Sequence, residues 1–521
     1  MEIFEKRKEK VKEWFKNKEN LLLFLILLFA LGIRLYYFFM TKMQPLWWDE
    51  AAYGSLAKNF AYHLWNNTSL IDRESTIRPL LFPLLWSFLL RINFGESAVR
   101  FILIVIPSVL SVLFVYLIGK ELYGKAVGFI SSFIFSVLWI HLFYTDRLLT
   151  DVPTTFFVFA SIYFFIKSVN TEFKPKIFAL SLALLSIGTM IRYPSGLVFF
   201  AYLLFLIFTR KFNLIKNKKF LLYGIIGLLP ILLFFVINYF TFGNIFPALF
   251  ADDYLNPVQS GGETAPFALS FLKYIAIYLN VEGYNLNVEG YIKNVFFIFF
   301  ILGLGIMLFE SVLGYDQIHK SQKLQSYLLS ILVLAIICAF FVFYLRGGED
   351  RYLLAASASI ICMTGLGLNY LYNFIKKYNK AFAVIIILAL LGWGTYTQVN
   401  FADELIKSKK ESFLQMRQGF EWIRDNTPKE SIILGQGIEA YAIYYAERQY
   451  ERLSPNITNV NEINADYLVD HAFTERAGYM DEYIQKNQDK WKPIQVFFID
   501  KQQKQPIFIV YEKADNLPTI N

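Results

Sequence analysis

The chain has 521 residues, of which 56% are hydrophobic and 18% aromatic, with a mean hydropathy of +0.42. Soluble domains are roughly 45–50% apolar, so this composition excludes an ordinary soluble protein. The net charge of +8 does not indicate a nucleic-acid partner, because the basic residues lie in short loops between apolar runs. Both cysteines, Cys338 and Cys362, fall inside such runs, which argues against a disulfide framework.

The apolar runs predict an α-helical polytopic membrane protein. A run of about 20 residues is long enough to cross a bilayer. We expect a basic cytoplasmic N-terminal segment at 1–20, a membrane domain at 21–399 with outer loops at 41–97 and 242–290, and a soluble domain at 400–521. The first run has no small-residue cleavage site after it, so it predicts a span and not a signal peptide. The eleven predicted spans are 21–40, 98–118, 126–143, 152–168, 176–191, 194–208, 220–241, 291–309, 327–345, 353–374 and 382–399.

Basic residues predict the orientation. The N-terminal segment carries seven of them at 6, 7, 8, 10, 12, 16 and 18, so it should remain cytoplasmic. With eleven spans, the C-terminal domain then lies on the extracytoplasmic face of the cell membrane. Two further segments are predicted to lie in the headgroup region. In residues 51–65, Leu56 and Phe60 share one helical face and Lys58 faces away from them, and residues 79–90 are apolar but too short to span.

An acidic pair, Asp49-Glu50, follows the first span in the stretch WWDEAAY at 47–53. Sugar transfer to a hydroxyl needs a carboxylate to accept the proton as the new bond forms. A helix N-terminus would keep such a pair ionised. The alternative is a solvated loop whose tryptophans lie in the interfacial aromatic belt. The spacing alone favours that alternative.

A second acidic position, Asp151, ends the turn TDRLLTD at 145–151, which should reach the same face. Its alternative role is to cap a helix that has Pro153 in its first turn, and both roles are compatible. Arg78, Arg346 and Arg351 lie at span ends, where a guanidinium can pair with phosphate oxygens. For each of them, interfacial snorkelling is the alternative.

Other charged residues favour structural roles. Arg34 and Arg100 lie in or near spans, where a charge needs a partner, and we expect structural ion pairs for both. His141 is expected to be a satisfied or solvated histidine. In the C-terminal domain, an amphipathic helix is predicted at 411–426, strands at 431–434, 467–469, 494–499 and 506–511, and helical turns at 441–448 and 481–486. This pattern indicates a small α/β domain, without a nucleotide-binding glycine loop, zinc-ligand spacing or nucleophile elbow.

The order of these motifs resembles the GT-C superfamily of membrane glycosyltransferases, in its protein O-mannosyltransferase and aminoarabinose-transferase-like branch. The motifs are an arginine in the first span, then DEAAY at 49–53, RPLLFP at 78–83, TDVP at 150–153, RYLL at 351–354 and WIRDNTP at 422–428. The resemblance covers most of the chain. Two departures are Leu80 after Pro79, where a second proline is common, and Ala355-Ala356 in place of a downstream proline. Both leave the donor sugar open.

The resemblance implies roles for individual residues. Asp49 matches the candidate general base, with Glu50 beside it, and Asp151 matches the second acidic site. Arg78 and Arg351 match basic residues near the carrier phosphate. The implied enzyme moves a hexosyl or pentosyl group from a dolichyl or undecaprenyl phosphate, by inverting single displacement, to a hydroxyl of a protein, lipid or glycan acceptor.

No cofactor is required on this interpretation. A divalent cation, Mg²⁺ or Mn²⁺, among Asp49, Glu50 and Asp151 is the minority alternative. The rival class is a polytopic transporter or lipid-linked sugar flippase. Transporters place functional charges near the midplane within internal repeats, whereas here no repeat is evident and the charges gather at one interface.

Overall fold

A computed structural model describes residues 5, 9, 13–62, 75, 77–170, 172–211, 214, 216–247, 271, 275–279, 294–341, 350–453, 465–474, 478–499 and 505–514. The chain forms two compact units. The first, here called the helical unit, comprises Met1–Lys42, Ile77–Leu81 and Arg100–Lys407. The second, here called the mixed unit, comprises Met43–Thr76, Phe82–Val99 and Ser408–Asn521. Part of the first loop therefore folds with the C-terminal segment. The predicted boundary at residue 400 stays a prediction.

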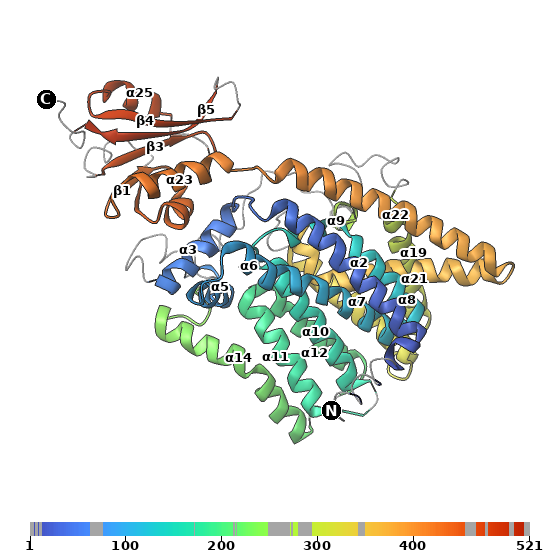
Figure 1. The fold of residues 1–521 in the computed structure, drawn as a ribbon. Coiled ribbons are helices and arrows are strands. Elements are labelled where there is room, and N and C mark those ends of the chain that lie inside the picture. The colour runs from blue at the N-terminus through green and yellow to red at the C-terminus, as the bar shows by residue number, and fades with distance from the viewer. Residues whose placement is uncertain are drawn as a thin grey trace. The chain divides into compact units, whose positions relative to one another are not determined.

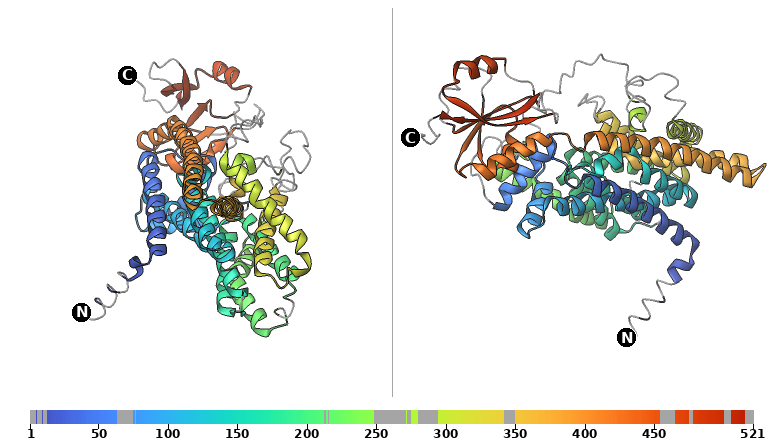
Figure 2. Two further views of the ribbon diagram at one scale, coloured as in Figure 1. Left: turned by 90° about the vertical axis from the view of Figure 1, so that its right-hand side faces the viewer. Right: turned by 45° about the horizontal axis from the view of Figure 1, so that its top comes forward.

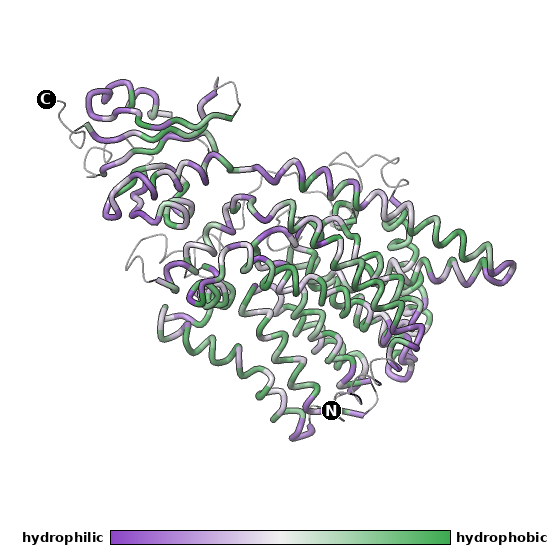
Figure 3. The backbone as a smooth tube through the Cα atoms, viewed as in Figure 1, coloured by the Kyte–Doolittle hydropathy of each residue, from purple (hydrophilic) through white to green (hydrophobic). Residues whose placement is uncertain are grey.

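The helical unit is a multi-pass bundle in which helices far apart in sequence lie side by side (Figure 1). Hydrophobic residues run along these helices, and hydrophilic residues are found at many of the turns between them (Figure 3). Its longer helices are α2 (Lys18–Thr41), α7 (Ile106–Tyr123), α8 (Lys125–Val137), α10 (Asp151–Val169), α11 (Pro175–Ile191), α12 (Val198–Phe208), α14 (Lys218–Phe242), α19 (Val295–Leu313), α20 (Gln322–Ala339), α21 (Ser357–Lys376) and α22 (Lys380–Lys409).

Each of the eleven predicted spans overlaps one of these helices, although residues 291–293 and 342–345 of two spans lie outside the described residues. The number of crossings is not confirmed. In the described part of the chain, eight helices are long and apolar enough to cross a membrane. A ninth candidate is the pair α8 and α9 (Trp139–Thr145), which is bent by 53°. The fifth and sixth predicted spans are the shorter apolar helices Pro175–Ile191 and Tyr193–Phe208. These two helices account for the difference between nine and eleven.

The bend between α8 and α9 is stabilised by hydrogen bonds from a distant helix. Leu138 is extended at this point, with φ −62° and ψ 119°, which breaks the helical hydrogen bonds. The freed amide of Trp139 donates to Oε1 of Gln398 at 3.1 Å, and Nε2 of Gln398 donates to the Leu279 carbonyl at 2.7 Å. Backbone groups at membrane depth need such partners, since no water is available there.

The mixed unit contains α3 (Trp48–Tyr62), α5 (Leu81–Arg91), α6 (Glu96–Arg100), α23 (Leu414–Asn426) and a five-stranded sheet. The strand order is β2-β1-β3-β5-β4, with β2, β1 and β3 parallel and β5 antiparallel to both β3 and β4. The strands are β1 (Ile432–Gly435), β2 (Gln449–Arg452), β3 (Tyr467–His471), β4 (Trp491–Phe498) and β5 (Pro506–Lys513). The four predicted strands are confirmed, whereas β2 follows a segment that was predicted only as a helical turn.

Helices α23 and α25 (Met480–Lys486) cover opposite faces of this sheet (Figure 2). The alternation along β5 explains why, because successive side chains of a strand point to opposite faces. Phe508 packs against Phe420 of α23, with ring centroids 5.1 Å apart, whereas Tyr511 belongs to the core cluster that contains Met480 and Tyr483 of α25. The sheet therefore has two hydrophobic faces, as in an α/β domain.

Candidate active site

Asp151 is the first residue of α10, and its side chain is 1% exposed. The N-cap of the helix is Thr150, so the prediction that Asp151 caps α10 is wrong by one residue, while Pro153 does lie in the first turn. The Thr155 hydroxyl donates to the Asp151 carbonyl at 2.8 Å. A carboxylate in the first turn interacts favourably with the positive end of the helix dipole.

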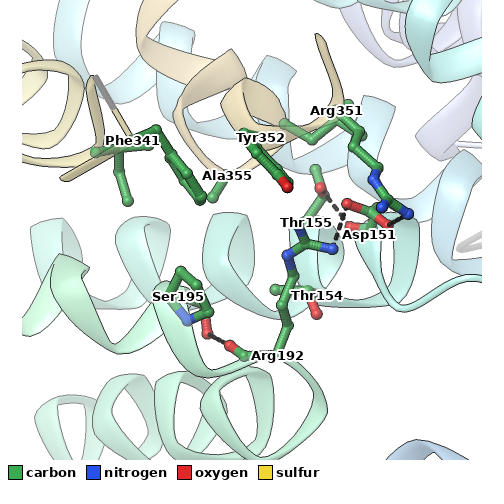
Figure 4. Close-up of a pocket in the computed structure, with 12 residues that line it drawn as sticks. Asp151, Thr154, Thr155, Arg192, Ser195, Phe341, Arg351, Tyr352 and Ala355 are labelled. Atoms are coloured by element: carbon green, nitrogen blue, oxygen red, sulfur yellow. Dashed lines mark hydrogen bonds and ion pairs between the residues drawn. The ribbon is translucent and has the colours of Figure 1, made fainter. Parts of the chain in front are cut away.

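Two arginines from different segments point at this carboxylate (Figure 4). Nη1 of Arg192 lies 2.6 Å from Oδ1 of Asp151, and Nη1 of Arg351 lies 3.9 Å from Oδ2. Arg192 occupies the break between α11 and the short helix η2 (Tyr193–Leu197), with an extended backbone at φ −152° and ψ 113°. Arg351 comes from the short helix η5 (Asp350–Ala356). The shorter contact is a close ion pair, and the longer one is a looser ion pair.

Aromatic and aliphatic side chains form the other wall of the same pocket. Tyr352 stacks on Phe341 with ring centroids 4.5 Å apart, and the Arg192 guanidinium lies 5.6 Å from the centre of the Tyr352 ring. The pocket is further lined by Thr154, Thr155, Pro194, Ser195, Ile337, Leu354 and Ala355. The side chains of Arg192 and Arg351 are 20% and 15% exposed, so both can be reached. The pocket therefore combines two cationic groups with a partly apolar wall.

A second group of buried polar residues in the helical unit surrounds Arg34. Arg34 donates to Oγ of Ser108 at 2.6 Å, to the Ser136 carbonyl at 3.0 Å and to Nδ1 of His141 at 2.9 Å. It is 0% exposed and sits within α2. These contacts give Arg34 and His141 structural roles in the bundle, although Arg34 is held by hydrogen bonds in place of the predicted ion pair.

Asp146 lies in the turn between α9 and α10 and is 2% exposed. Burial raises the pKa of this carboxyl to about 7, while Arg100, Arg147, Arg34 and a hydrogen bond with Thr41 act in the opposite direction. Arg100 in turn donates to the Thr41 carbonyl at 2.8 Å. The turn that delivers Asp151 is thus fixed at its start by a buried polar cluster.

The acidic pair lies in the mixed unit, where its two members are in different environments. Glu50 is 0% exposed, and its Oε2 accepts from the Trp47 amide at 2.7 Å. The Ala51 amide donates to the Trp47 carbonyl at 2.7 Å, so Trp47 is the N-cap and Glu50 closes half of a capping box. Asp49 is half-buried in the first turn of α3. The geometry therefore gives Glu50 a structural task and leaves Asp49 as the more accessible carboxylate.

Comparison with known proteins gives one family match and several structural matches. Residues 77–237 match the family described as dolichyl-phosphate-mannose-protein mannosyltransferase. No curated protein matches the chain. An oligosaccharyltransferase from Archaeoglobus fulgidus, solved with a tethered acceptor peptide, superposes with a TM-score of 0.61 at 14% identity, over 98% of this chain and 76% of that one.

Two further structures are similar over nearly the whole chain. ArnT from Cupriavidus metallidurans, bound to undecaprenyl phosphate, has a TM-score of 0.61 at 8% identity, over 93% of this chain and 97% of that one. The arabinofuranosyltransferase AftD from Mycobacteria has a TM-score of 0.53 at 9% identity, over 93% of this chain and 41% of that one. The chain has the GT-C fold. At these identities, the similarity shows the fold and leaves the activity to be argued from the site.

Within this GT-C fold, the predicted site residues fall into separate groups. Asp151 and Arg351 are brought together in one pocket, and Asp49 and Glu50 are neighbours in the mixed unit. Arg78 is half-buried just before α5 and is not among the described residues that line the pocket. Arg346 lies outside the described residues. Arg192 was not predicted to be a site residue, although its place between two predicted spans, just before Tyr193-Pro194, was a usable signal.

Two of the three residues considered for a divalent cation have other partners in the structure. No group of three or more His, Cys, Asp or Glu side chains suited to a metal gathers in the part of the chain that the structure describes. Both Asp151 oxygens face guanidinium groups, and Glu50 holds the Trp47 amide. One structure of the Archaeoglobus oligosaccharyltransferase is a complex with zinc and sulfate, which is a property of that protein.

Proposed function

We propose that the chain is a glycosyltransferase that moves a sugar from a polyprenyl phosphate to an acceptor hydroxyl at the membrane surface. The observation that carries the proposal is the pocket in which Arg192 and Arg351 converge on Asp151 beside the Tyr352 ring. Its cations suit a phosphate and its apolar lining suits a lipid chain. Support comes from structural relatives that contain undecaprenyl phosphate or dolichol phosphate.

In the proposed reaction, the acceptor oxygen attacks the anomeric carbon as the bond between that carbon and the phosphate oxygen breaks. The configuration inverts, because the attack comes from the side opposite the leaving group. Asp49 accepts the hydroxyl proton, and the departing phosphate keeps the electron pair of the broken bond. Arg192 and Arg351 stabilise that charge as preorganised donors, and Arg78 and Arg346 remain further candidates for this role. Asp151 holds the two guanidiniums in place before the donor arrives.

The substrates are proposed at the level of class. The family match names a mannosyl donor, whereas the structural relatives include proteins named for arabinofuranosyl and oligosaccharyl transfer. The donor sugar is therefore a hexosyl or pentosyl group, and the acceptor is a protein, lipid or glycan. Mass spectrometry of lipid-linked sugars and glycans, from cells with and without the gene, identifies both.

The test of the function uses the full chain in proteoliposomes with mannose, glucose or arabinose linked to dolichyl or undecaprenyl phosphate. We expect release of polyprenyl phosphate that requires an acceptor, here a threonine-containing peptide or a membrane glycolipid extract. Asp49→Asn keeps the size of the side chain but cannot accept a proton. General-base catalysis typically contributes about 10²- to 10⁴-fold, so transfer should fall by that order while donor binding persists.

The flippase alternative predicts a different result in the same vesicles. A flippase moves the lipid-linked sugar between leaflets and leaves the sugar–phosphate bond intact, so no polyprenyl phosphate is released. Leaflet exchange without bond cleavage would therefore reject the transferase. Near-normal transfer by Asp49→Asn would reject the assignment of the base and shift it to Asp151. Glu50→Gln should retain most of the activity, because an amide oxygen can still accept from the Trp47 amide.

A further inference from the structure

The helix that carries the acidic pair is held along one side by residues 440–447, here called the anchoring segment. The Ser55 hydroxyl donates to the Ala440 carbonyl at 2.7 Å. Nζ of Lys58 donates to the Tyr444 carbonyl at 2.6 Å and forms an ion pair with Oε1 of Glu447 at 2.7 Å. Lys58 was expected to face water beside the headgroups, but its side chain is only 14% exposed. The polar side of α3 is thus a protein contact.

The closest approach between α3 and the anchoring segment occurs at Gly54. A β-carbon at this position would lie 2.7 Å from the Tyr444 ring and 3.1 Å from Trp86. The ring is held by Nζ of Lys58, which lies 4.5 Å from its centre, and by its hydroxyl, which donates to Oε2 of Glu96 at 3.0 Å. A larger residue at position 54 would therefore have to displace a ring that is held in place.

The chain just before the acidic pair is held by the same segment. The Leu46 amide donates to the Tyr445 hydroxyl at 2.9 Å. Arg417 of α23 donates to the Met43 carbonyl at 3.1 Å, and its guanidinium lies 5.5 Å from the centre of the Tyr445 ring. Trp48 contacts Tyr441 edge to face, with ring centroids 5.3 Å apart. The turn that leads into α3 is thus fixed on both sides of Trp47.

The held side of α3 is opposite the side that carries Asp49. At 3.6 residues per turn, successive residues are rotated by about 100°, so positions 51, 54, 55 and 58 share one face. Asp49 is about half a turn away from the centre of that face by the same rotation. The contacts therefore fix the position and rotation of α3 from the side opposite Asp49.

We propose that the anchoring segment positions Asp49 for catalysis, through Tyr445 of the segment and through Lys58 of α3, which binds the segment. The inference rests on the proposed function, in which Asp49 is the base. A base must lie within hydrogen-bond reach of the hydroxyl that it deprotonates, and a misplacement of about 1 Å can cost roughly 10²-fold in rate. The C-terminal sheet domain thereby contributes to turnover without supplying a reacting group.

The test compares variants that remove one anchoring contact each in the full-length protein. Tyr445→Phe removes the hydroxyl that accepts from Leu46 and keeps the ring, and Lys58→Met removes the ion pair with Glu447. We expect kcat for transfer from dolichyl-phosphate mannose to a threonine-containing peptide to fall about tenfold or more, with the donor KM within about twofold. Lys58→Arg should recover most of the rate. Lys486→Met, which removes an exposed ion pair with Glu482 in the same unit, is the matched control.

Two measurements separate positioning from general destabilisation. In an Asp49→Asn background, Tyr445→Phe should cause no further loss of rate, because residues that act through one group are not additive. Hydrogen exchange at the amides of residues 46–53 should quicken in Tyr445→Phe but not in Lys486→Met, with the melting temperature of the helical unit unchanged.

The possible failures point to different conclusions. The positioning role would be overturned if Tyr445→Phe and Lys58→Met kept full kcat while Asp49→Asn was inactive. That result would leave the proposed function intact. Equal proportional losses from Tyr445→Phe in the wild-type and Asp49→Asn backgrounds would also overturn it, since the segment would then act independently of Asp49. No transfer by the wild type from any mannosyl, glucosyl or arabinosyl polyprenyl phosphate would overturn the proposed function and this inference with it.

Discussion

The position of Arg192 beside Asp151 could not be predicted from the sequence. An arginine in a short break between two apolar runs is equally typical of an interfacial residue that snorkels to the headgroups. Its contact with Asp151 depends on how α10 and α11 pack against each other, which is not a local property of either helix. The proposed roles of Asp49, Asp151 and Arg351 were predicted from the order of motifs along the chain. That order can be recognised without knowing the tertiary contacts. Glu50 as a capping residue was missed, since Trp47 is an unusual N-cap.

We expect Arg192→Ala and Arg351→Ala each to weaken the binding of undecaprenyl phosphate. Loss of one charge-assisted contact costs roughly 1.5–3 kcal/mol, or about tenfold to a hundredfold in affinity. Arg192→Ala should cost more, because it also leaves the Asp151 carboxylate with only the 3.9 Å contact to Arg351. Binding to protein in nanodiscs, measured by native mass spectrometry, checks this.

The control for these two variants is Lys377→Ala, which removes an exposed cation at the end of α21. Equal affinity in all three variants and the wild type would mean that the two arginines only balance Asp151 and do not bind the phosphate.

At the scale of elements, the apolar runs located the helices because length and hydropathy are local properties. They did not reveal that the third predicted span is broken at Leu138, since the break depends on Gln398 in a helix near the end of the bundle. The edge strand β2 was missed for a related reason. It is only four residues long and is defined by its pairing with β1. Short elements that depend on distant partners leave little signal in their own sequence.

We expect Gln398→Leu to destabilise the bundle. It would leave the buried Trp139 amide without its partner, at a cost of about 1–3 kcal/mol, whereas the Leu279 carbonyl would keep its hydrogen bond from Nδ2 of Asn294. The melting temperature in detergent, followed by intrinsic fluorescence, should fall by several degrees. Asn400→Ala on the exposed side of the same helix is the control. An unchanged melting temperature in Gln398→Leu would show that the broken helix needs no such support.

For the whole molecule, the charge pattern predicts a cytoplasmic N-terminus and an extracytoplasmic C-terminus. A phosphatase reporter that is active only outside the cytoplasm, fused after Asn521, should be active, and a cytoplasmic reporter at the same position should be silent. The opposite result would mean an even number of crossings. In that case, the short helices Pro175–Ile191 and Tyr193–Phe208, which flank Arg192, would not both cross the membrane. Reporters placed at residues 171 and 212 distinguish these cases.

The carboxylate in the arginine pocket has a consequence for selectivity. An empty pocket with two guanidiniums alone would attract any small anion from the medium, whereas Asp151 already occupies them as a built-in competitor. We infer that an entering anion must bind the two arginines more strongly than Asp151 does. A lipid-borne phosphate can gain the extra binding free energy from burial of its apolar chain. Asp151→Asn weakens this competition, so this variant should bind inorganic phosphate measurably by calorimetry while the wild type does not. Equal phosphate binding by both would mean that Asp151 does not compete and has no part in ligand choice.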